Sequence, residues 1–303
     1  EKILKKYSPK KIVIYSRDEF KQYKMQETFP PNKYKSLRYF LGDVRDLERL
    51  KMAMRGADYV IHAAALKQVP AAEYNPMEYV KTNIYGAENI IQASISQKVK
   101  KILALSTDKA ANPINLYGAT KLASDKIFIA ANNIVGSDNI SFSVVRYGNV
   151  MASRGSVVPF FNKLKNDNKK FLPITDKNMT RFFITLDQGV DFVIKSLNQM
   201  TGGEMFVPKI PSVRIVDLAK AIAPGLKHKI VGVRPGEKIH ELMCPNESVE
   251  NTLEFKDKFI IFPSPSIFDN KIKLSKKRYG GKGKKVSKNF EYSSDKNSNF
   301  LSV

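Results

Sequence analysis

Two short segments carry side chains suited to proton transfer on a hydroxylated substrate. Tyr117 and Lys121 are four residues apart where a helix is predicted to begin, so they share one helix face about one turn apart. A phenol has a pKa of about 10, and a neighbouring ammonium lowers it, which lets a tyrosine act as base toward a sugar hydroxyl. Such a pair also occurs on ordinary helix surfaces.

Three further polar residues precede this helix. Thr107, Asp108 and Lys109 directly follow an apolar segment at 101–105 that is typical of a buried strand. They place a hydroxyl, a carboxylate and an ammonium beside the tyrosine. All five side chains together form a candidate catalytic site.

These segments belong to an alternating series of strands and helices. Apolar runs predict strands at 11–15, 37–41, 59–62, 101–105 and 141–146. Helical patterns occur at 46–54, 76–96, 116–133 and 187–200. This order predicts an α/β fold with a Rossmann-like, doubly wound parallel sheet, in which ligands bind at the carboxyl ends of the strands.

Glycine and proline punctuate shorter elements after residue 148, including a helix at 213–221 and a strand at 229–233. They indicate a smaller carboxyl-terminal substrate-binding lobe. We predict that 1–155 form an NADP-binding domain to which 184–201 return. The ranges 156–183 and 202–303 are predicted to form the lobe.

Composition limits the class of protein. No apolar run in the 303 residues reaches the roughly 20 residues that a membrane helix needs, so no membrane association is expected. The single cysteine, Cys244, excludes an internal disulfide, and the first residues lack the pattern of a signal peptide, so we expect a cytoplasmic protein. No histidine or cysteine cluster has metal-ligand spacing, and no metal is expected.

The net charge of +22 raises the possibility of a nucleic-acid partner. Lysines are scattered along the chain, however, with the densest stretch at 276–285, and no nucleic-acid-binding motif accompanies them. A lysine-rich surface with a basic cleft for phosphorylated ligands is the favoured interpretation.

Arg17 follows the strand at 11–15, where NAD enzymes usually place an acidic residue that binds the ribose 2'-hydroxyl. A cation at this position suits a 2'-phosphate, and Ser16 and Lys21 can join it, so NADP is favoured over NAD. The alternative is that Arg17 pairs with Asp18 or Glu19 on the surface.

The sequence resembles a known family, the inverting UDP-N-acetylglucosamine 4,6-dehydratases, over nearly its entire length. The motifs that carry the resemblance are Leu105-Ser106-Thr107-Asp108-Lys109-Ala110, Asn115-Leu116-Tyr117-Gly118-Ala119-Thr120-Lys121, Gly42-Asp43-Val44-Arg45-Asp46, His62-Ala63-Ala64-Ala65-Leu66-Lys67, Arg146-Tyr147-Gly148-Asn149-Val150, Thr180-Arg181-Phe182-Phe183 and Arg234-Pro235-Gly236-Glu237-Lys238.

The resemblance implies a redox-neutral cycle on UDP-N-acetylglucosamine. Hydride leaves C4 of the sugar, water is lost across C5 and C6, and hydride returns to C6, which yields a 4-keto-6-deoxy sugar for glycan or flagellin synthesis. It implies that Tyr117 deprotonates the C4 hydroxyl, that Lys121 lowers the tyrosine pKa and holds the nicotinamide ribose, and that Thr107 contacts the C4 oxygen. Asp108 then protonates the departing C6 hydroxyl.

Lys109 is the position that distinguishes this family, because the related retaining dehydratases carry glutamate there. The resemblance implies a lysine base that acts at C5 from the other face. Such a base must be partly deprotonated, which burial and the neighbouring Lys121 are expected to bring about. The alternative role for Lys109 is a contact to substrate phosphate.

The resemblance also implies contacts along the ligands. Asp43 and Val44 would flank the adenine, and Ala63, Ala64 and Ala65 would let the backbone approach the cofactor, with Lys67 near a ribose and the substrate. The residues expected to bind substrate are Asn149, Val158, Pro159, Phe160, Arg181, Arg234 and Glu237. A homo-oligomer is also expected.

One expected part is missing, because the first strand of the fold and its glycine-rich turn should precede Glu1. We favour a truncated sequence, since the other motifs are undamaged. The alternatives are a UDP-sugar 4- or 5-epimerase on the same scaffold, a non-catalytic relative without cofactor, and a nucleic-acid-binding protein that uses the basic tail.

Overall fold

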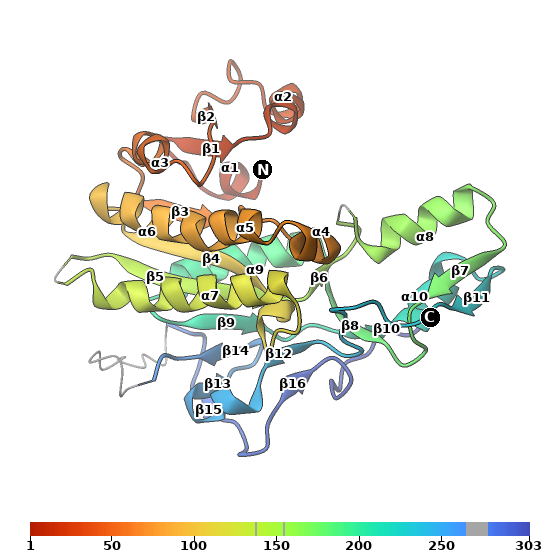
Figure 1. The fold of residues 1–303 in the computed structure, drawn as a ribbon. Helices are drawn as coiled ribbons and strands as arrows, with labels where there is room; N and C mark the ends of the chain where they lie inside the picture. Colours follow the sequence, from red (N-terminus) through yellow and green to blue (C-terminus); the bar gives the residue numbers. More distant parts are fainter. Residues whose placement is uncertain (137, 154, 265–277) are drawn as a thin grey trace.

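The computed structural model describes residues 1–136, 138–153, 155–264 and 278–303 (Figure 1). Its centre is a sheet in the strand order β15-β13-β14-β9-β5-β4-β3. The strands β3 (Tyr59–His62), β4 (Lys101–Thr107), β5 (Ser141–Tyr147) and β9 (Met205–Pro208) run parallel. The predicted α/β class with a Rossmann-like sheet is confirmed.

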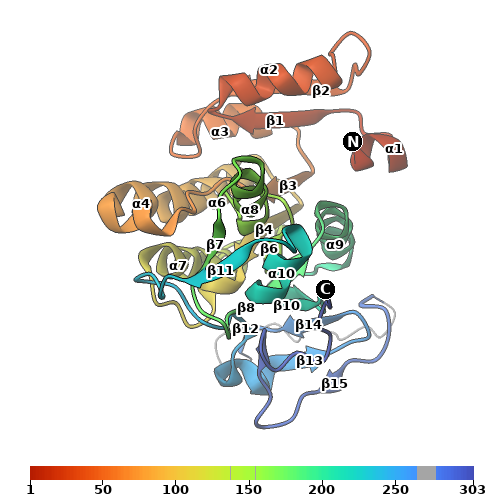
Figure 2. The same ribbon diagram turned by 90° about the vertical axis from the view of Figure 1, so that its right-hand side faces the viewer.

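Helices cover both faces of this sheet (Figures 1 and 2). On one face lie α3 (Leu47–Met54), α6 (Gly86–Ser96) and α7 (Leu116–Ala130), and on the other lies α9 (Leu186–Gln199). Successive side chains of a strand point to opposite faces. Accordingly Ile102 of β4 packs with Phe128 of α7, whereas its neighbour Leu103 packs with Phe192 of α9.

The predicted helix at 76–96 is interrupted. It consists of α5 (Pro76–Tyr79), a π-helical segment η1 (Val80–Tyr85) and α6. The wider turn buries Asn83, whose side chain accepts a hydrogen bond from the Leu66 backbone N–H and donates one to the Leu66 carbonyl, both at 2.9 Å. The segment thereby fixes the backbone that follows β3, and α4 (Val69–Tyr74) comes directly after it.

The first part of the chain forms a separate pair of strands. The strands β1 (Ile12–Ser16) and β2 (Leu37–Leu41) are parallel, and α1 (Lys2–Lys6) and α2 (Glu19–Thr28) flank them. Among the described residues β1 pairs with β2 alone, and β3 pairs with β4 alone. The expected strand ahead of Glu1 lies outside the sequence and stays a prediction.

The lobe lies beyond the carboxyl ends of β4 and β5. It contains β6 (Asn149–Val150), α8 (Val157–Asn166), β7 (Phe171–Ile174), β8 (Thr180–Ile184), β10 (Ser212–Arg214), α10 (Ile215–Ile222) and β11 (Lys227–Ile230). Phe161, Leu172, Ile174 and Ile215 form its buried core. The predicted strand at 229–233 begins earlier, because β11 pairs with β7 from Lys227 onward.

The range 202–303 does not belong to the lobe as a whole. Besides β9, the strands β13 (Thr252–Glu254), β14 (Lys258–Ile261) and β15 (Lys284–Lys285) extend the main sheet in antiparallel fashion. The predicted assignment of the whole range 202–303 to the lobe is therefore corrected, because backbone hydrogen bonds join these strands to the main sheet. Near the lobe, β12 (Leu242–Cys244) pairs with β16 (Tyr292–Ser293), after which η4 (Asn246–Asn251) leads to β13.

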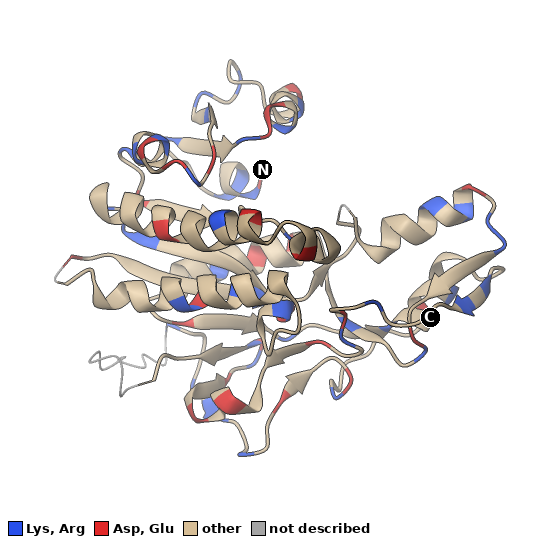
Figure 3. Ribbon diagram, in the orientation of Figure 1, with Lys and Arg blue, Asp and Glu red and all other residues tan. Residues whose placement is uncertain are grey.

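Lysine and arginine occur on helices, strands and loops of every layer (Figure 3). In the densest basic stretch, 276 and 277 lie outside the described residues, while Lys284 and Lys285 pair with β13 as the edge strand. Within the described ranges, no helix is long and apolar enough to cross a membrane.

A buried ion pair joins the central strands to α7. Asp125 accepts hydrogen bonds from Ser106 at 2.7 Å and from the Arg146 guanidinium at 3.2 Å, and both Asp125 and Arg146 are almost fully buried. The Arg146 guanidinium also donates to the Met243 carbonyl. This network therefore connects β4, β5, α7 and β12.

We expect Asp125→Ala to lower the free energy of unfolding by about 3 kcal/mol or more, because it leaves the buried arginine charge unpaired. Asp191→Ala is the control: its ion pair with Lys2 is exposed, so its loss should have a much smaller effect on the free energy of unfolding. Urea denaturation measures both. Equal effects of the two variants would contradict the assignment.

Candidate active site

The catalytic candidates lie where β4 ends and α7 begins. Thr107 is the last residue of β4, and Asp108 and Lys109 belong to the short 3-10 turn η2 (Asp108–Ala110). Asn115 then caps α7 by accepting a hydrogen bond from the Gly118 backbone N–H at 2.8 Å. The turn and the cap fix the direction in which Tyr117 leaves the helix.

Gly118 permits the close approach of α7 to η2. A Cβ atom at this position would lie 2.3 Å from the Lys109 carbonyl oxygen. Real Cβ atoms do not come this close to backbone, so only glycine lets the helix pack against the turn that carries Asp108 and Lys109.

The Tyr117 phenol is protonated in this structure. Burial raises the pKa of Tyr117 to about 12, against the opposing effects of the Lys109 charge and a hydrogen bond with Thr107. We expected Lys121 to be the cation that lowers this pKa. In this structure the cation that lowers the Tyr117 pKa is Lys109. The Lys121 ammonium instead donates a hydrogen bond to the Leu105 carbonyl at 2.9 Å.

Lys121 is itself buried. Burial lowers its pKa, and the nearby carboxylate of Asp125 partly opposes that effect. Lys121 in turn acts on His62, whose pKa falls to about 3 because of burial and this neighbouring charge. His62 is therefore neutral.

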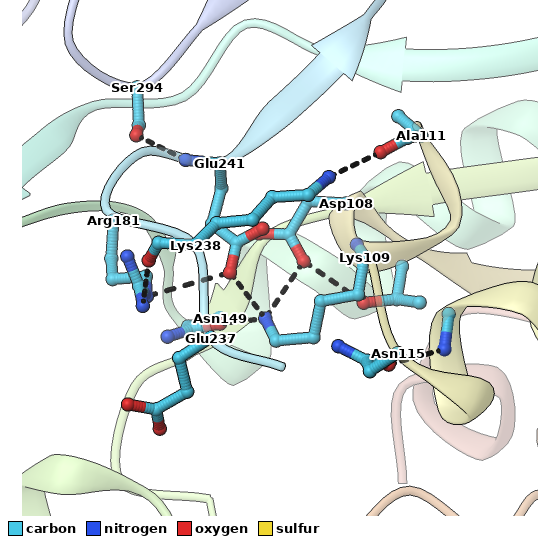
Figure 4. Close-up of polar contacts among 12 residues, drawn as sticks. Asp108, Lys109, Ala111, Asn115, Asn149, Arg181, Glu237, Lys238, Glu241 and Ser294 are labelled. Carbon is cyan, nitrogen blue, oxygen red and sulfur yellow. Dashed lines mark hydrogen bonds and ion pairs between the residues drawn. The ribbon is translucent and has the colours of Figure 1, made fainter. Parts of the chain in front are cut away.

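The Lys109 ammonium lies between two buried carboxylates (Figure 4). Its Nζ atom is 3.1 Å from Asp108 Oδ1 and 3.2 Å from Glu241 Oε1, and it donates to Asn149 Oδ1 at 3.3 Å. Asp108 Oδ1 also accepts a hydrogen bond from the Thr107 hydroxyl at 3.0 Å. One carboxylate oxygen thus links a hydroxyl and an ammonium.

The expected lowering of the Lys109 pKa is wrong for this structure. Burial alone would lower the pKa, but the charges of Asp108 and Glu241 outweigh it and raise the pKa above its ordinary value. Lys121 does not produce the effect that we predicted. Lys109 is a cation here, and any role as a base requires it to pass on a proton first.

A cavity of about 850 Å³ opens over these groups. The predicted site residues that line it are Ala63, Ala65, Lys67, Thr107, Lys109, Tyr117, Lys121, Asn149, Pro159, Phe160, Arg181, Arg234 and Glu237. Asp108 is fully buried beneath its wall, and Ala64 and Val158 are not among the lining residues. The cavity therefore brings together groups from the main sheet and the lobe.

The two candidate arginines differ in availability. Arg181 is almost fully buried, and its guanidinium donates to the backbone carbonyls of Thr180, Lys238 and Ile239. Arg234 is exposed and forms an ion pair with Glu237 at 2.6 Å. Of these two, Arg234 is the freer donor for an anionic ligand.

The residues predicted for the adenosine end lie outside this cavity, after β1 and β2. Arg17 donates to Asp43 at 3.2 Å, a partner other than Asp18 and Glu19, the two that the alternative named. Lys21 pairs with Asp18, and the Ser16 hydroxyl accepts a hydrogen bond from the Asp18 backbone N–H. Val44 is buried against Gly86.

Sequence reasoning missed two residues of the site. Glu241 contacts Lys109, and Lys238 donates to the Ala111 carbonyl at 2.6 Å just behind η2 (Figure 4). The local sequence contains one signal for Glu241, an acidic residue directly before the apolar strand 242–244. Nothing local indicates that this strand begins beside Lys109.

We expect Gly118→Ala to lower the melting temperature markedly, because the added methyl group forces α7 away from η2 and overpacking of this kind costs about 1–3 kcal/mol. Gly225→Ala is the matched control, since a Cβ atom there meets no atom within 4 Å. Differential scanning calorimetry measures both variants. A Gly118→Ala protein as stable as the control would contradict the close packing.

Relatives match almost the whole chain. A protein from Campylobacter jejuni subsp. jejuni serotype O:23/36 (strain 81-176), "UDP-N-acetylglucosamine 4,6-dehydratase (inverting)", is 57% identical over 300 residues, which are 99% of this chain and 89% of the relative. "UDP-glucose 4-epimerase" of Rickettsia akari (strain Hartford) is 45% identical over 245 residues, covering 79% of this chain and 70% of the relative.

Solved structures agree with the fold. The X-ray structure of Pen from Bacillus thuringiensis has a TM-score of 0.87 and 37% identity, covering 98% of this chain and 88% of that one. DesIV, a dTDP-glucose 4,6-dehydratase from Streptomyces venezuelae solved with NAD and TYD bound, has a TM-score of 0.68 at 19% identity, covering 77% of this chain and 78% of that one.

The model of the family described as "Polysaccharide biosynthesis protein" matches residues 1–263. The expected family relationship is confirmed by this match and by the Campylobacter relative. This chain belongs to the polysaccharide biosynthesis protein family.

Proposed function

We propose that this protein catalyses the 4,6-dehydration of UDP-N-acetylglucosamine with inversion at C5. The observation that carries the proposal is the Asp108–Lys109 ion pair, in which Lys109 lines the same cavity as Tyr117 and Asp108 is buried beneath the cavity wall. Elimination of water needs both a base and an acid near a hydroxyl-oxidising centre. The name of the Campylobacter relative supports the same substrate and stereochemistry.

Tyr117 serves as the base toward the C4 hydroxyl. Its raised pKa means that it needs nearby positive charge to lose its proton, and the Lys109 ammonium supplies that charge. Thr107, which hydrogen-bonds to Asp108, is placed to hold the C4 oxygen. Tyr117, Thr107 and Lys109 all line the same cavity.

Asp108 and Lys109 supply the elimination step. Transfer of one proton from Lys109 Nζ to Asp108 Oδ1, across 3.1 Å, turns the ion pair into a free amine and a carboxylic acid without changing the net charge. The amine takes the proton from C5, and the acid protonates the C6 hydroxyl, which leaves as water. Both groups then return to the charged forms that the structure contains.

A nicotinamide dinucleotide fits the residues on either side of the cavity, and we propose NADP. It would supply reversible hydride acceptance from C4. Lys121 lies beside Tyr117 where it can hold the ribose, and the backbone at Ala63 and Ala65 lines the cavity. Arg17 is about half exposed and shares Asp43 with Arg45, so its guanidinium can turn to a 2'-phosphate.

Arg234, Lys67 and Lys163 place positive charge around the outer part of the cavity, which suits the diphosphate of a UDP sugar. Pro159 and Phe160 offer apolar surface to the uridine, and Asn149 and Glu237 are placed to contact the sugar. We further propose that the protein is cytoplasmic and homo-oligomeric.

The second candidate is a UDP-sugar epimerase. The relatives from Rickettsia named UDP-glucose 4-epimerase favour it. A 4-epimerase needs a base at the C4 hydroxyl but no acid for a leaving C6 hydroxyl. The buried Asp108 in contact with Lys109 therefore favours dehydration.

We expect the protein to dehydrate UDP-N-acetylglucosamine in deuterated water with NADP present. The experiment uses the chain together with any residues that its gene encodes ahead of Glu1. Mass spectrometry and NMR should find the loss of one water, a 4-keto group and deuterium at C5. A product of unchanged mass with an altered C4 centre would support the epimerase instead.

Lys109→Ala should reduce dehydration by at least about a hundredfold, because general base catalysis contributes about that much or more. Lys163→Ala is the matched control. Lys163 lines the same cavity, but among the described residues no contact joins it to Asp108 or Tyr117. It should change KM and leave most of kcat. Full kcat in Lys109→Ala would remove lysine as the base.

We expect Arg17→Ala to weaken NADP binding by about tenfold or more and to leave NAD binding nearly unchanged, because only NADP carries the 2'-phosphate. Isothermal titration calorimetry with each dinucleotide measures the two affinities. Arg214→Ala, an exposed arginine of the lobe paired with Asp217, is the control. Equal losses for NADP and NAD would contradict the assignment.

A further inference from the structure

Glu241 is a buried carboxylate that the proposed reaction does not use. It lies directly before β12 and is about 2% exposed. Its backbone is fixed on both sides, since its N–H donates to the Ser294 hydroxyl and its carbonyl accepts from the Ser294 N–H, each at 2.8 Å. The backbone of Glu241 is thus fixed where the residue lines the cavity.

The side chain of Glu241 points at the catalytic lysine. Its Oε1 atom lies 3.2 Å from Lys109 Nζ and 3.6 Å from Arg181 Nε, and Figure 4 shows both contacts. Its Oε2 atom has no hydrogen-bond partner among the described residues. Arg181 already donates to three backbone carbonyls, so it does not need Glu241 to stay in place.

Burying a carboxylate with one free oxygen is costly unless its charge has a use. The Glu241 carboxylate faces two cations, the Lys109 ammonium and the Arg181 guanidinium. The shorter of the two contacts is the one to the Lys109 ammonium, at 3.2 Å, and this ammonium also faces Asp108.

We propose that Glu241 is a positioning residue that keeps one proton on the Asp108–Lys109 pair over the working pH range. This inference rests on the proposed function, in which that single proton is first on Lys109 and then on Asp108. If the pair lost the proton, Lys109 could still act as a base, but Asp108 could no longer protonate the leaving hydroxyl. Glu241 preserves the acid by holding the proton near the pair.

The charged and titratable groups that face Lys109 come from several elements. Asp108 precedes it in η2, Tyr117 comes from α7, Arg181 from β8, and Glu241 from the segment before β12. Lys238 also lies nearby, since the Lys109 charge contributes to lowering the Lys238 pKa. Of these groups, Asp108 and Glu241 raise the Lys109 pKa most strongly, and Arg181 lowers it.

The test replaces Glu241 by glutamine, which keeps the shape and removes the charge. Removing a negative charge next to an ammonium lowers the ammonium pKa by about one unit or more. The neutral amine of Lys109 should therefore appear at lower pH in Glu241→Gln. Acetic anhydride labels neutral amines, and mass spectrometry of the Lys109 peptide follows the labelling rate against pH.

Glu237→Gln is the matched control. It removes a carboxylate from the same cavity whose ion-pair partner is Arg234 and not Lys109, so the labelling curve of Lys109 should stay in place. An unchanged curve in Glu241→Gln would overturn the proposal. If Glu241→Gln does not fold, Glu241→Asp decides, since withdrawing the carboxylate by one methylene must also move the curve to lower pH.

Turnover provides a second readout. In the pH profile of kcat, the alkaline limb marks loss of the last proton from the Asp108–Lys109 pair, and it should move to lower pH in Glu241→Gln by the same amount as the labelling curve. A purely structural role would lower kcat at every pH without moving the limb. Labelling needs no turnover, so it separates failure of this inference from failure of the proposed function.

Discussion

The site depends on one ammonium held between two buried carboxylates. Asp108 is fully buried, and a carboxylate in that position is costly unless a cation and hydrogen-bond donors compensate it. Lys109 provides the cation, but it must itself be held by Glu241 from a distant part of the chain. The fold therefore has to bring the end of β4, the lobe and the segment before β12 to one point.

Backbone contacts fulfil this requirement. Asn115 caps α7 and also donates to the Gly236 carbonyl at 2.7 Å, so one side chain positions both the helix of Tyr117 and the loop of Arg234. Lys238 donates to the Ala111 carbonyl from the same loop. The turn that carries Asp108 and Lys109 is thus fixed by the sheet, the helix and the lobe together, which preorganises it for catalysis.

The predictable part of the site is the part that is local in sequence. Thr107, Lys109 and Tyr117 could be placed from the end of one apolar strand and the start of the next helix, and the structure brings them into one cavity. Glu241 could not be placed, because its role follows from tertiary contacts alone. The predicted direction of the Lys109 pKa shift is wrong because two carboxylates raise this pKa. Asp108 has the larger effect and is local in sequence, whereas Glu241 adds to it from a distant part of the chain. Short strands such as β9, β13 and β15 join the main sheet through pairings that no local pattern reveals.

The resting protonation states also explain how such a site can avoid side reactions. The phenol of Tyr117 and the ammonium of Lys109 both have raised pKa values, so both groups favour their protonated forms. Transfer of one proton to Asp108 activates base and acid together, while Tyr117 needs additional stabilisation of its anion. The Lys109 ammonium lowers the Tyr117 pKa, and the burial of both groups strengthens this interaction. Glu241, whose carboxylate lies 3.2 Å from the Lys109 ammonium, keeps the required proton on the Asp108–Lys109 pair.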